Sequence, residues 1–80
     1  MTWHTLYPHD GRAFRLPCGC VNITVHRWDG KGGWWLTCVE ADYVAHRLDT
    51  EDVERAKNLA VEMVRMRLQE ALDKLSEGGE

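Results

Sequence analysis

The fold of this chain is decided by residues 21–48, which read VNITVHRWDGKGGWWLTCVEADYVAHRL. At the start of this stretch, Val21, Ile23 and Val25 alternate with polar residues. That alternation is typical of a β-strand with one buried face and one exposed face.

The rest of the stretch continues the same pattern. Three glycines in residues 29–33 supply the positive φ angles that a hairpin turn needs. Residues 34–39 are aromatic and β-branched, as strands prefer, and residues 43–48 form a third strand after a short turn. We therefore predict an antiparallel β-meander over residues 21–48.

The register of the first hairpin stays open at this point, because adjacent strand residues point to opposite faces of a sheet. In one register, the core face carries Trp34, Leu36 and Cys38 together with Val21, Ile23 and Val25. A slip by one residue turns Trp35 and Val39 inward instead.

Residues 50–76 have the pattern of one long helix, with Asp49 and Thr50 as N-cap candidates. Apolar residues recur at spacings of three and four and form one stripe: Val53, Ala56, Ala60, Met63, Val64, Leu68, Ala71, Leu72 and Leu75. Such a helix is about 39 Å long at 1.5 Å per residue. A strand of six to eight residues spans only about 20–26 Å, so we expect the helix to overhang the sheet.

Together these elements predict one domain over residues 1–80, with an irregular N-terminal segment at residues 1–20. The predicted class is α+β, a three- or four-stranded antiparallel β-meander packed on one long C-terminal α-helix. The fourth strand in this prediction is a short edge strand at residues 13–16, before a proline that cannot donate to a ladder.

Composition and charge exclude several classes of protein. The chain has 80 residues, of which 44% are hydrophobic and 29% charged, which excludes a disordered tail and a large cofactor-binding enzyme. No apolar run reaches the ~18–20 residues of a membrane span, and no secretory signal is visible, so we expect a cytoplasmic protein without membrane contact. Residues 1–48 carry a charge of +1 and residues 49–80 a charge of −4. The acidic second half disfavours direct binding of nucleic acid.

Three cysteines, Cys18, Cys20 and Cys38, offer the sharpest chemical alternative, a small structural or adaptor module stabilised by zinc. Structural zinc sites usually use pairs spaced C-x₂₋₄-C, which this chain lacks, so we favour reduced thiols and no metal or cofactor. The four histidines are scattered and no catalytic motif is present. We therefore expect a protein that is not an enzyme.

Tryptophan is abundant near one loop, and Trp and charged side chains together are typical of interface hot spots. The acidic residues at the helix start suit the helix dipole and also offer a docking patch for a basic partner. The predicted partner-binding residues are Trp28, Asp29, Lys31, Trp34, Trp35, Asp49, Glu51, Asp52 and Glu54.

A small acidic chain with a Trp-rich meander, followed by a capped helix that begins TEDVERAK at residues 50–57, resembles the accessory proteins of bacteriophages and prophages. Among these it is similar to anti-CRISPR proteins, with type I systems as the expected target. The resemblance covers residues 21–76. It implies a non-catalytic inhibitor in the cytoplasm of a bacterial host that occupies a protein surface of a Cas effector subunit, such as its DNA-binding surface.

We favour a monomer over a homodimer. The overhanging part of the helix leaves Leu68, Ala71, Leu72 and Leu75 in need of cover. A fold-back of the N-terminal segment, with its large apolar residues Trp3, Leu6, Tyr7 and Phe14, is expected to provide that cover. Pairing of two copies through the stripe is the alternative.

Overall fold

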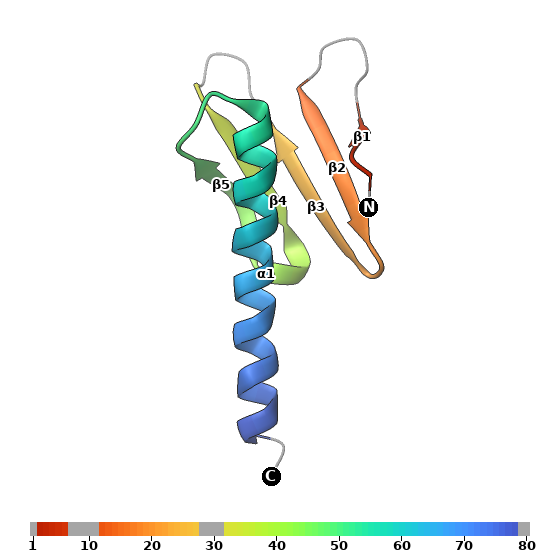
Figure 1. The fold of residues 1–80 in the computed structure, drawn as a ribbon, viewed down its shortest axis with the longest axis vertical. Coiled ribbons are helices and arrows are strands. Elements are labelled where there is room, and N and C mark those ends of the chain that lie inside the picture. Colours follow the sequence, from red (N-terminus) through yellow and green to blue (C-terminus); the bar gives the residue numbers. More distant parts are fainter. Residues whose placement is uncertain (1, 7–11, 28–31, 79–80) are drawn as a thin grey trace.

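The computed structural model consists of one antiparallel sheet with a single long helix on one of its faces (Figure 1). It describes residues 2–6, 12–27 and 32–78. The strands follow one another in sequence order across the sheet. Their bounds are β1 His4–Thr5, β2 Ala13–Cys18, β3 Val21–His26, β4 Trp34–Cys38 and β5 Tyr43–Leu48, with a 3₁₀ turn at Val39–Ala41 and the helix α1 at Val53–Gly78. The predicted α+β class is confirmed, with five strands in place of three or four.

Residues 1–20 were predicted to be irregular apart from a short edge strand at 13–16, and this is wrong, because the two strands β1 and β2 extend the meander. β2 is not an edge strand but lies between β1 and β3, and it continues through Pro17. The residues on either side of the two-residue turn, Cys18 and Val21, form the pair that closes the hairpin. Pro17 lies at the next, non-hydrogen-bonded position, where a strand nitrogen points away from β3, so β2 loses no ladder bond to β3 there.

The core lies between the sheet and the first half of α1. The structure selects the first of the two registers, since Val25 pairs with Leu36 and both side chains have no exposed surface. The core consists of Leu16, Ile23, Val25, Trp34, Leu36, Cys38, Ala41, Tyr43, Leu48, Ala56, Ala60 and Val64. Alanines at positions 56 and 60 let the helix backbone approach the sheet closely.

A bulge distinguishes the last strand pair. Leu36 pairs with His46 and Cys38 with Tyr43, so two residues of β5 lie opposite Thr37. One of them, Ala45, has a φ of 49°, a left-handed conformation that is uncommon outside glycine. The Ala45 N–H donates a hydrogen bond to Thr37 Oγ1 at 3.1 Å, which holds the bulge in place.

The helix begins later and ends later than predicted, at Val53–Gly78 instead of 50–76. Thr50 precedes the helix, and its Oγ1 accepts a hydrogen bond from the Asp52 N–H at 3.1 Å. The first helical bond runs from the Ala56 N–H to the Asp52 carbonyl, so Asp52 is the residue at the start of the helix. Within the described ranges, no helix combines the length and the apolar character needed to cross a bilayer.

Candidate binding surface

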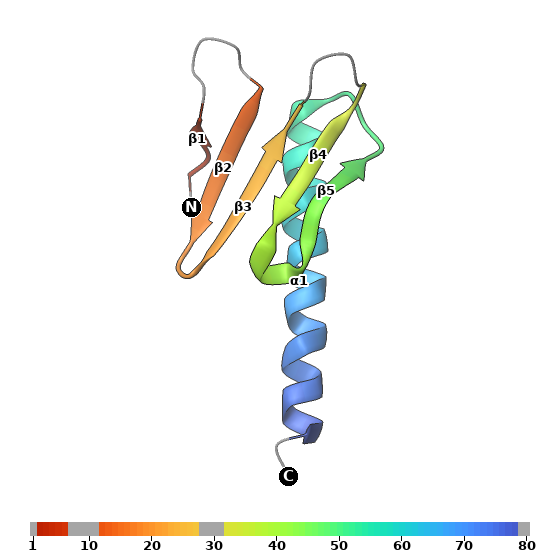
Figure 2. The same cartoon turned by 180° about the vertical axis from the view of Figure 1, so that it is seen from behind.

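The sheet has one face that α1 does not cover. Figure 2 looks directly at this face, and among the described residues no element lies in front of it. We call this face the open face. Cross-strand pairing places on it the side chains of His4, Arg15, Thr24, His26, Trp35, Thr37 and Arg47. The helix and the open face therefore lie on opposite sides of one sheet.

Trp35 lies at the centre of one row of the open face. It pairs with His26 on β3 and with Arg47 on β5, so its indole is flanked by an imidazole and a guanidinium. Its side chain is half-buried, while that of Arg47 is exposed. Of the two adjacent tryptophans, Trp35 is thus the one on the open face, where part of its ring is exposed while its Nε1 is buried.

Trp34 points to the other face and is only 4% exposed. Its ring centroid lies 5.9 Å from that of Phe14, and its Nε1–H donates a hydrogen bond to the Glu51 carbonyl at 3.1 Å. The prediction that Trp34 belongs to the partner-binding residues is therefore wrong, because its indole is part of the core and ties the start of α1 to the sheet.

His26 is fixed by a hydrogen bond on the open face. Its Nε2 lies 2.9 Å from Thr37 Oγ1, the same oxygen that accepts the Ala45 N–H. Burial lowers the pKa of His26, because a partly desolvated imidazole disfavours the charged form. The imidazole is therefore neutral at pH 7, and Thr37 serves to hold β3, β4 and β5 together.

The open face carries basic side chains of its own. Arg15 and Arg47 are both exposed. Asp49 provides a carboxylate at the rim, with its Oδ1 3.9 Å from Arg47 Nε. Both side chains are largely in solvent, so this ion pair contributes little to stability and leaves both groups accessible to a partner.

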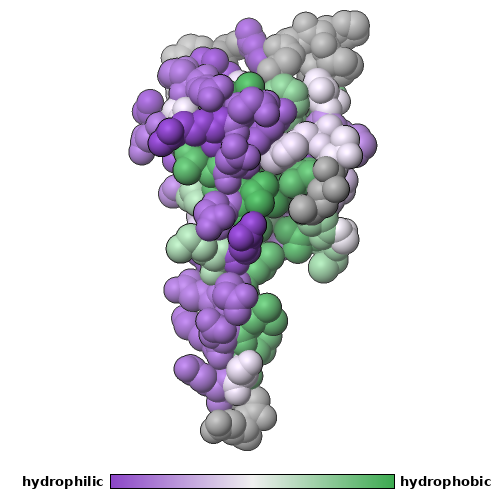
Figure 3. Space-filling model, viewed as in Figure 1, coloured by the Kyte–Doolittle hydropathy of each residue, from purple (hydrophilic) through white to green (hydrophobic). Residues whose placement is uncertain are grey.

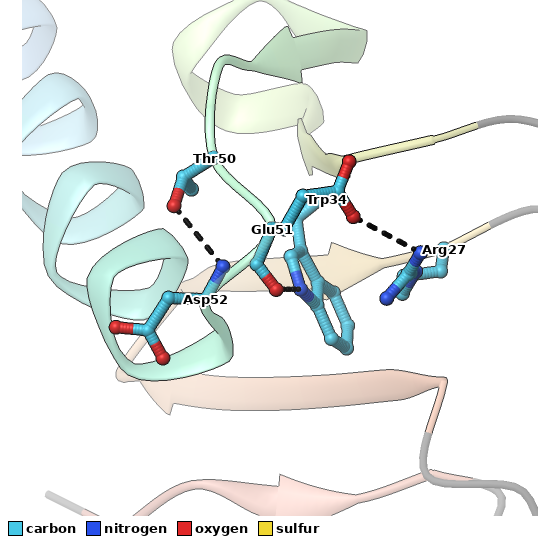
Figure 4. A network of polar contacts seen from close by, with 5 residues as sticks. All are labelled: Arg27, Trp34, Thr50, Glu51 and Asp52. Atoms are coloured by element: carbon cyan, nitrogen blue, oxygen red, sulfur yellow. Dashed lines mark hydrogen bonds and ion pairs between the residues drawn. The ribbon is translucent and has the colours of Figure 1, made fainter.

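Figure 4 shows the polar network at the start of α1, which includes two of the predicted acidic residues, Glu51 and Asp52. Glu51 Oε2 accepts from Arg27 Nη2 at 3.2 Å, and the Glu51 carbonyl accepts the Trp34 indole hydrogen. Asp52 starts the helix and its backbone N–H bonds to Thr50. The charge of Glu51 is thus already offset by a cation of the same chain.

The charge of Glu54 is likewise offset by a cation of the same chain. Its Oε2 lies 3.3 Å from Nζ of Lys57, one turn further along α1. Lys57 Nζ also lies 4.2 Å from the centroid of the Phe14 ring and 5.6 Å from that of Trp3. The predicted acidic patch therefore exists as a group of exposed carboxylates, but neighbouring cations of the chain reduce its field toward a basic partner.

The predicted residues Trp28, Asp29 and Lys31 lie outside the described residues. The described residues on either side of them are Arg27, just after β3, and Gly32, shortly before β4.

The three cysteines do not come together. Cys18 is half-buried at the end of β2, Cys20 is exposed in the turn and Cys38 is buried at the end of β4. Burial raises the pKa of the Cys38 thiol. Within residues 2–6, 12–27 and 32–78, no three His, Cys, Asp or Glu side chains are grouped so that they could hold a metal ion.

An apolar groove of about 260 Å³ lies between α1 and the β2–β3 hairpin. Its lining residues are Cys18, Val21, Ile23, Val61, Val64, Arg65 and Leu68. Figure 3 shows that apolar surface continues from here along one side of the lower part of α1. The overhang expected from the sequence is therefore present, while the groove beside it had no signal in the sequence.

Sequence reasoning also missed most of the open face. It selected Trp35 on this face and Asp49 at its rim, but not Arg15, His26 or Arg47. The available signal was the alternation itself, since every second residue of a strand lies on the face opposite the core. Comparison of the chain with protein-family models, with curated proteins and with solved structures found no match.

Proposed function

We propose that this chain is a non-catalytic binding protein that inhibits a larger complex by occupying one of its protein surfaces. The proposed target is the one that anti-CRISPR proteins bind, a subunit of a Cas effector complex. The observation that carries the proposal is the open face, a sheet face with no described cover that presents Trp35 between His26 and Arg47.

The composition of this face supports a protein as the partner. Tryptophan and arginine are the side chains most enriched among interface hot spots, and a rigid sheet holds them without loss of backbone entropy on binding. The two exposed arginines of the open face, Arg15 and Arg47, suit a target surface with acidic groups. Asp49 at the rim adds a group that selects against a wholly acidic partner.

Nucleic acid is the less favoured ligand. The whole chain has a net charge of −3, and nucleic-acid affinity depends mainly on neutralising phosphates with many cations. For that purpose the open face offers two exposed arginines, the neutral imidazole of His26 and the exposed side chain of His4. Binding of duplex or single-stranded DNA is therefore an outcome that the test must be able to detect.

The test is the plating efficiency of a phage that is targeted by a type I CRISPR system of its bacterial host. Expression of the chain is expected to restore plating, and the Trp35→Ala variant is expected to lose this effect. The control is Met66→Ala, which shortens an apolar side chain on α1 that is more exposed than Trp35 and lies away from the open face. Circular dichroism establishes that both variants remain folded.

Binding is then measured directly with the purified effector complex. Removal of Trp35 is expected to weaken binding by about 2 kcal/mol, or about 30-fold in Kd. Failure of the wild-type chain to restore plating with every type I system tested would refute the target class. A gel shift of DNA at physiological salt that depends on Trp35 would replace the protein partner with nucleic acid.

A further inference from the structure

The last turns of α1 extend beyond the sheet and keep an apolar stripe. The helix has 26 residues, about 39 Å at 1.5 Å per residue, whereas the six-residue strands span about 20 Å. Leu72 is 57% exposed and Leu75 is 69% exposed. In Figure 3 the apolar surface of this part of the helix lies on the side of the β2–β3 hairpin.

The described N-terminal segment does not cover this stripe. Trp3 and Phe14 pack against the core, and their rings lie beside Lys57 near the start of α1. Lys57 and Leu72 are fifteen residues apart, about 22 Å along the helix axis. The cover on which the expected monomer depends is therefore not provided by these side chains.

The stripe and the groove beside it form one self-complementary surface. The protruding leucines, Leu72 and Leu75, follow directly along α1 after the groove residues Val61, Val64 and Leu68. The leucines and the groove lie on the same side of α1, about one to four helical turns apart. When a two-fold axis passes between them, the leucines of each copy can fill the groove of the other.

We propose that two copies of this chain pair through this surface, with antiparallel α1 helices and the two-fold axis near Leu68. In this arrangement Leu72 and Leu75 of each chain enter the groove of the other. The partner leucines then meet the side chains that line the groove: Cys18, Val21, Ile23, Val61, Val64 and Leu68.

Charge at the rim of the groove fits the same arrangement. An antiparallel pair about Leu68 places Arg65 opposite residues 71–73 of the other copy, where Asp73 supplies a carboxylate. Arg65 is exposed, and within its own chain its Nη1 lies 3.8 Å from the Glu62 carboxylate, a loose contact that leaves it available. The symmetry forms the Arg65–Asp73 pair twice.

The pairing surface is separate from the open face, because α1 and the open face lie on opposite sides of the sheet. A dimer of this kind therefore leaves both open faces accessible. If the proposed function holds, each dimer presents two binding faces and gains avidity for a target with repeated subunits. The pairing itself does not depend on that function.

Light scattering coupled to gel filtration tests the pairing over a range of protein concentration. The wild-type chain is expected to have about twice the mass of one chain at tens of micromolar. The variant Leu72→Glu/Leu75→Glu is expected to be monomeric and folded, since both side chains are largely exposed. Met66→Glu is the matched control, because Met66 is 63% exposed but faces away from the groove, and it is expected to remain dimeric.

A charge swap tests the register of the pair. Arg65→Glu is expected to raise the dimer dissociation constant about tenfold, and Arg65→Glu/Asp73→Arg is expected to restore it. A wild-type chain that stays monomeric up to several hundred micromolar would overturn the proposal. So would a dimer that survives Leu72→Glu/Leu75→Glu, or one that Met66→Glu disrupts equally. Loss of pairing without loss of phage inhibition would leave the proposed function standing by itself.

Discussion

Replacement of Val25 by alanine tests the central feature of the fold, that only one face of the sheet is packed. Val25 has no exposed surface and lies between Phe14 and Leu36 on the helix-facing side. The change removes two methyl groups, worth about 1.6 kcal/mol of transfer free energy at 0.8 kcal/mol each. The cavity that remains in a rigid sheet adds to this loss, so we expect Val25→Ala to cost about 2–3 kcal/mol.

The same substitution at Val44 is the matched control. Val44 also lies in a strand, β5, but is 74% exposed, so its methyl groups lose little contact when the side chain is shortened. We expect Val44→Ala to change the free energy of unfolding by no more than about 0.5 kcal/mol. The difference between the two variants then measures burial, since the chemical change is identical.

Urea unfolding followed by tryptophan fluorescence and by circular dichroism measures both variants. An 80-residue domain has a free energy of unfolding of about 4–12 kcal/mol, so Val25→Ala is expected to remain folded at 25 °C. Its Tm is expected to fall by about 10–20 °C, with an unchanged urea m-value. Equal costs at Val25 and Val44, or a cost below about 1 kcal/mol at Val25, would refute the one-sided core.

Three further predictions concern single side chains. Cys20 is expected to react with a thiol reagent in the native protein, whereas Cys38, buried and with a raised pKa, is expected to react only after unfolding; equal rates would contradict the core. Burial lowers the pKa of His26, so its contribution to stability is complete above pH 6.5 and is lost as the pH falls from there toward the lowered pKa. Urea midpoints between pH 7.5 and 5 are expected to fall more for wild type than for His26→Gln, and parallel curves would refute this. Trp34→Phe loses the hydrogen bond to Glu51 and is expected to cost about 1–2 kcal/mol in urea unfolding, with a cost near zero counting against that bond.

The class of fold was predictable because the apolar residues follow two regular periods, one typical of a strand and one typical of a helix. Alternation over residues 21–26 predicted β3, and a stripe at spacings of three and four predicted α1 and its overhang. Of the N-terminal strands, β2 was predicted only in part, as a short edge strand at residues 13–16, and β1 was not predicted. β1 is only two residues long and exists because His4 and Thr5 pair with β2, a long-range contact with no local pattern.

Of the candidate binding surface, the sequence alone determined that adjacent tryptophans point to opposite faces, together with the strand order and the acidic start of the helix. Only the tertiary structure decided which tryptophan is buried. The apolar residues of both registers are similar, and the choice depends on packing Val25 and Leu36 against α1. The open face is likewise a product of tertiary structure, because Arg15, Trp35 and Arg47 come from three strands and meet only when the sheet forms. Local sequence encodes the face on which each of these side chains lies, and long-range pairing determines its neighbours.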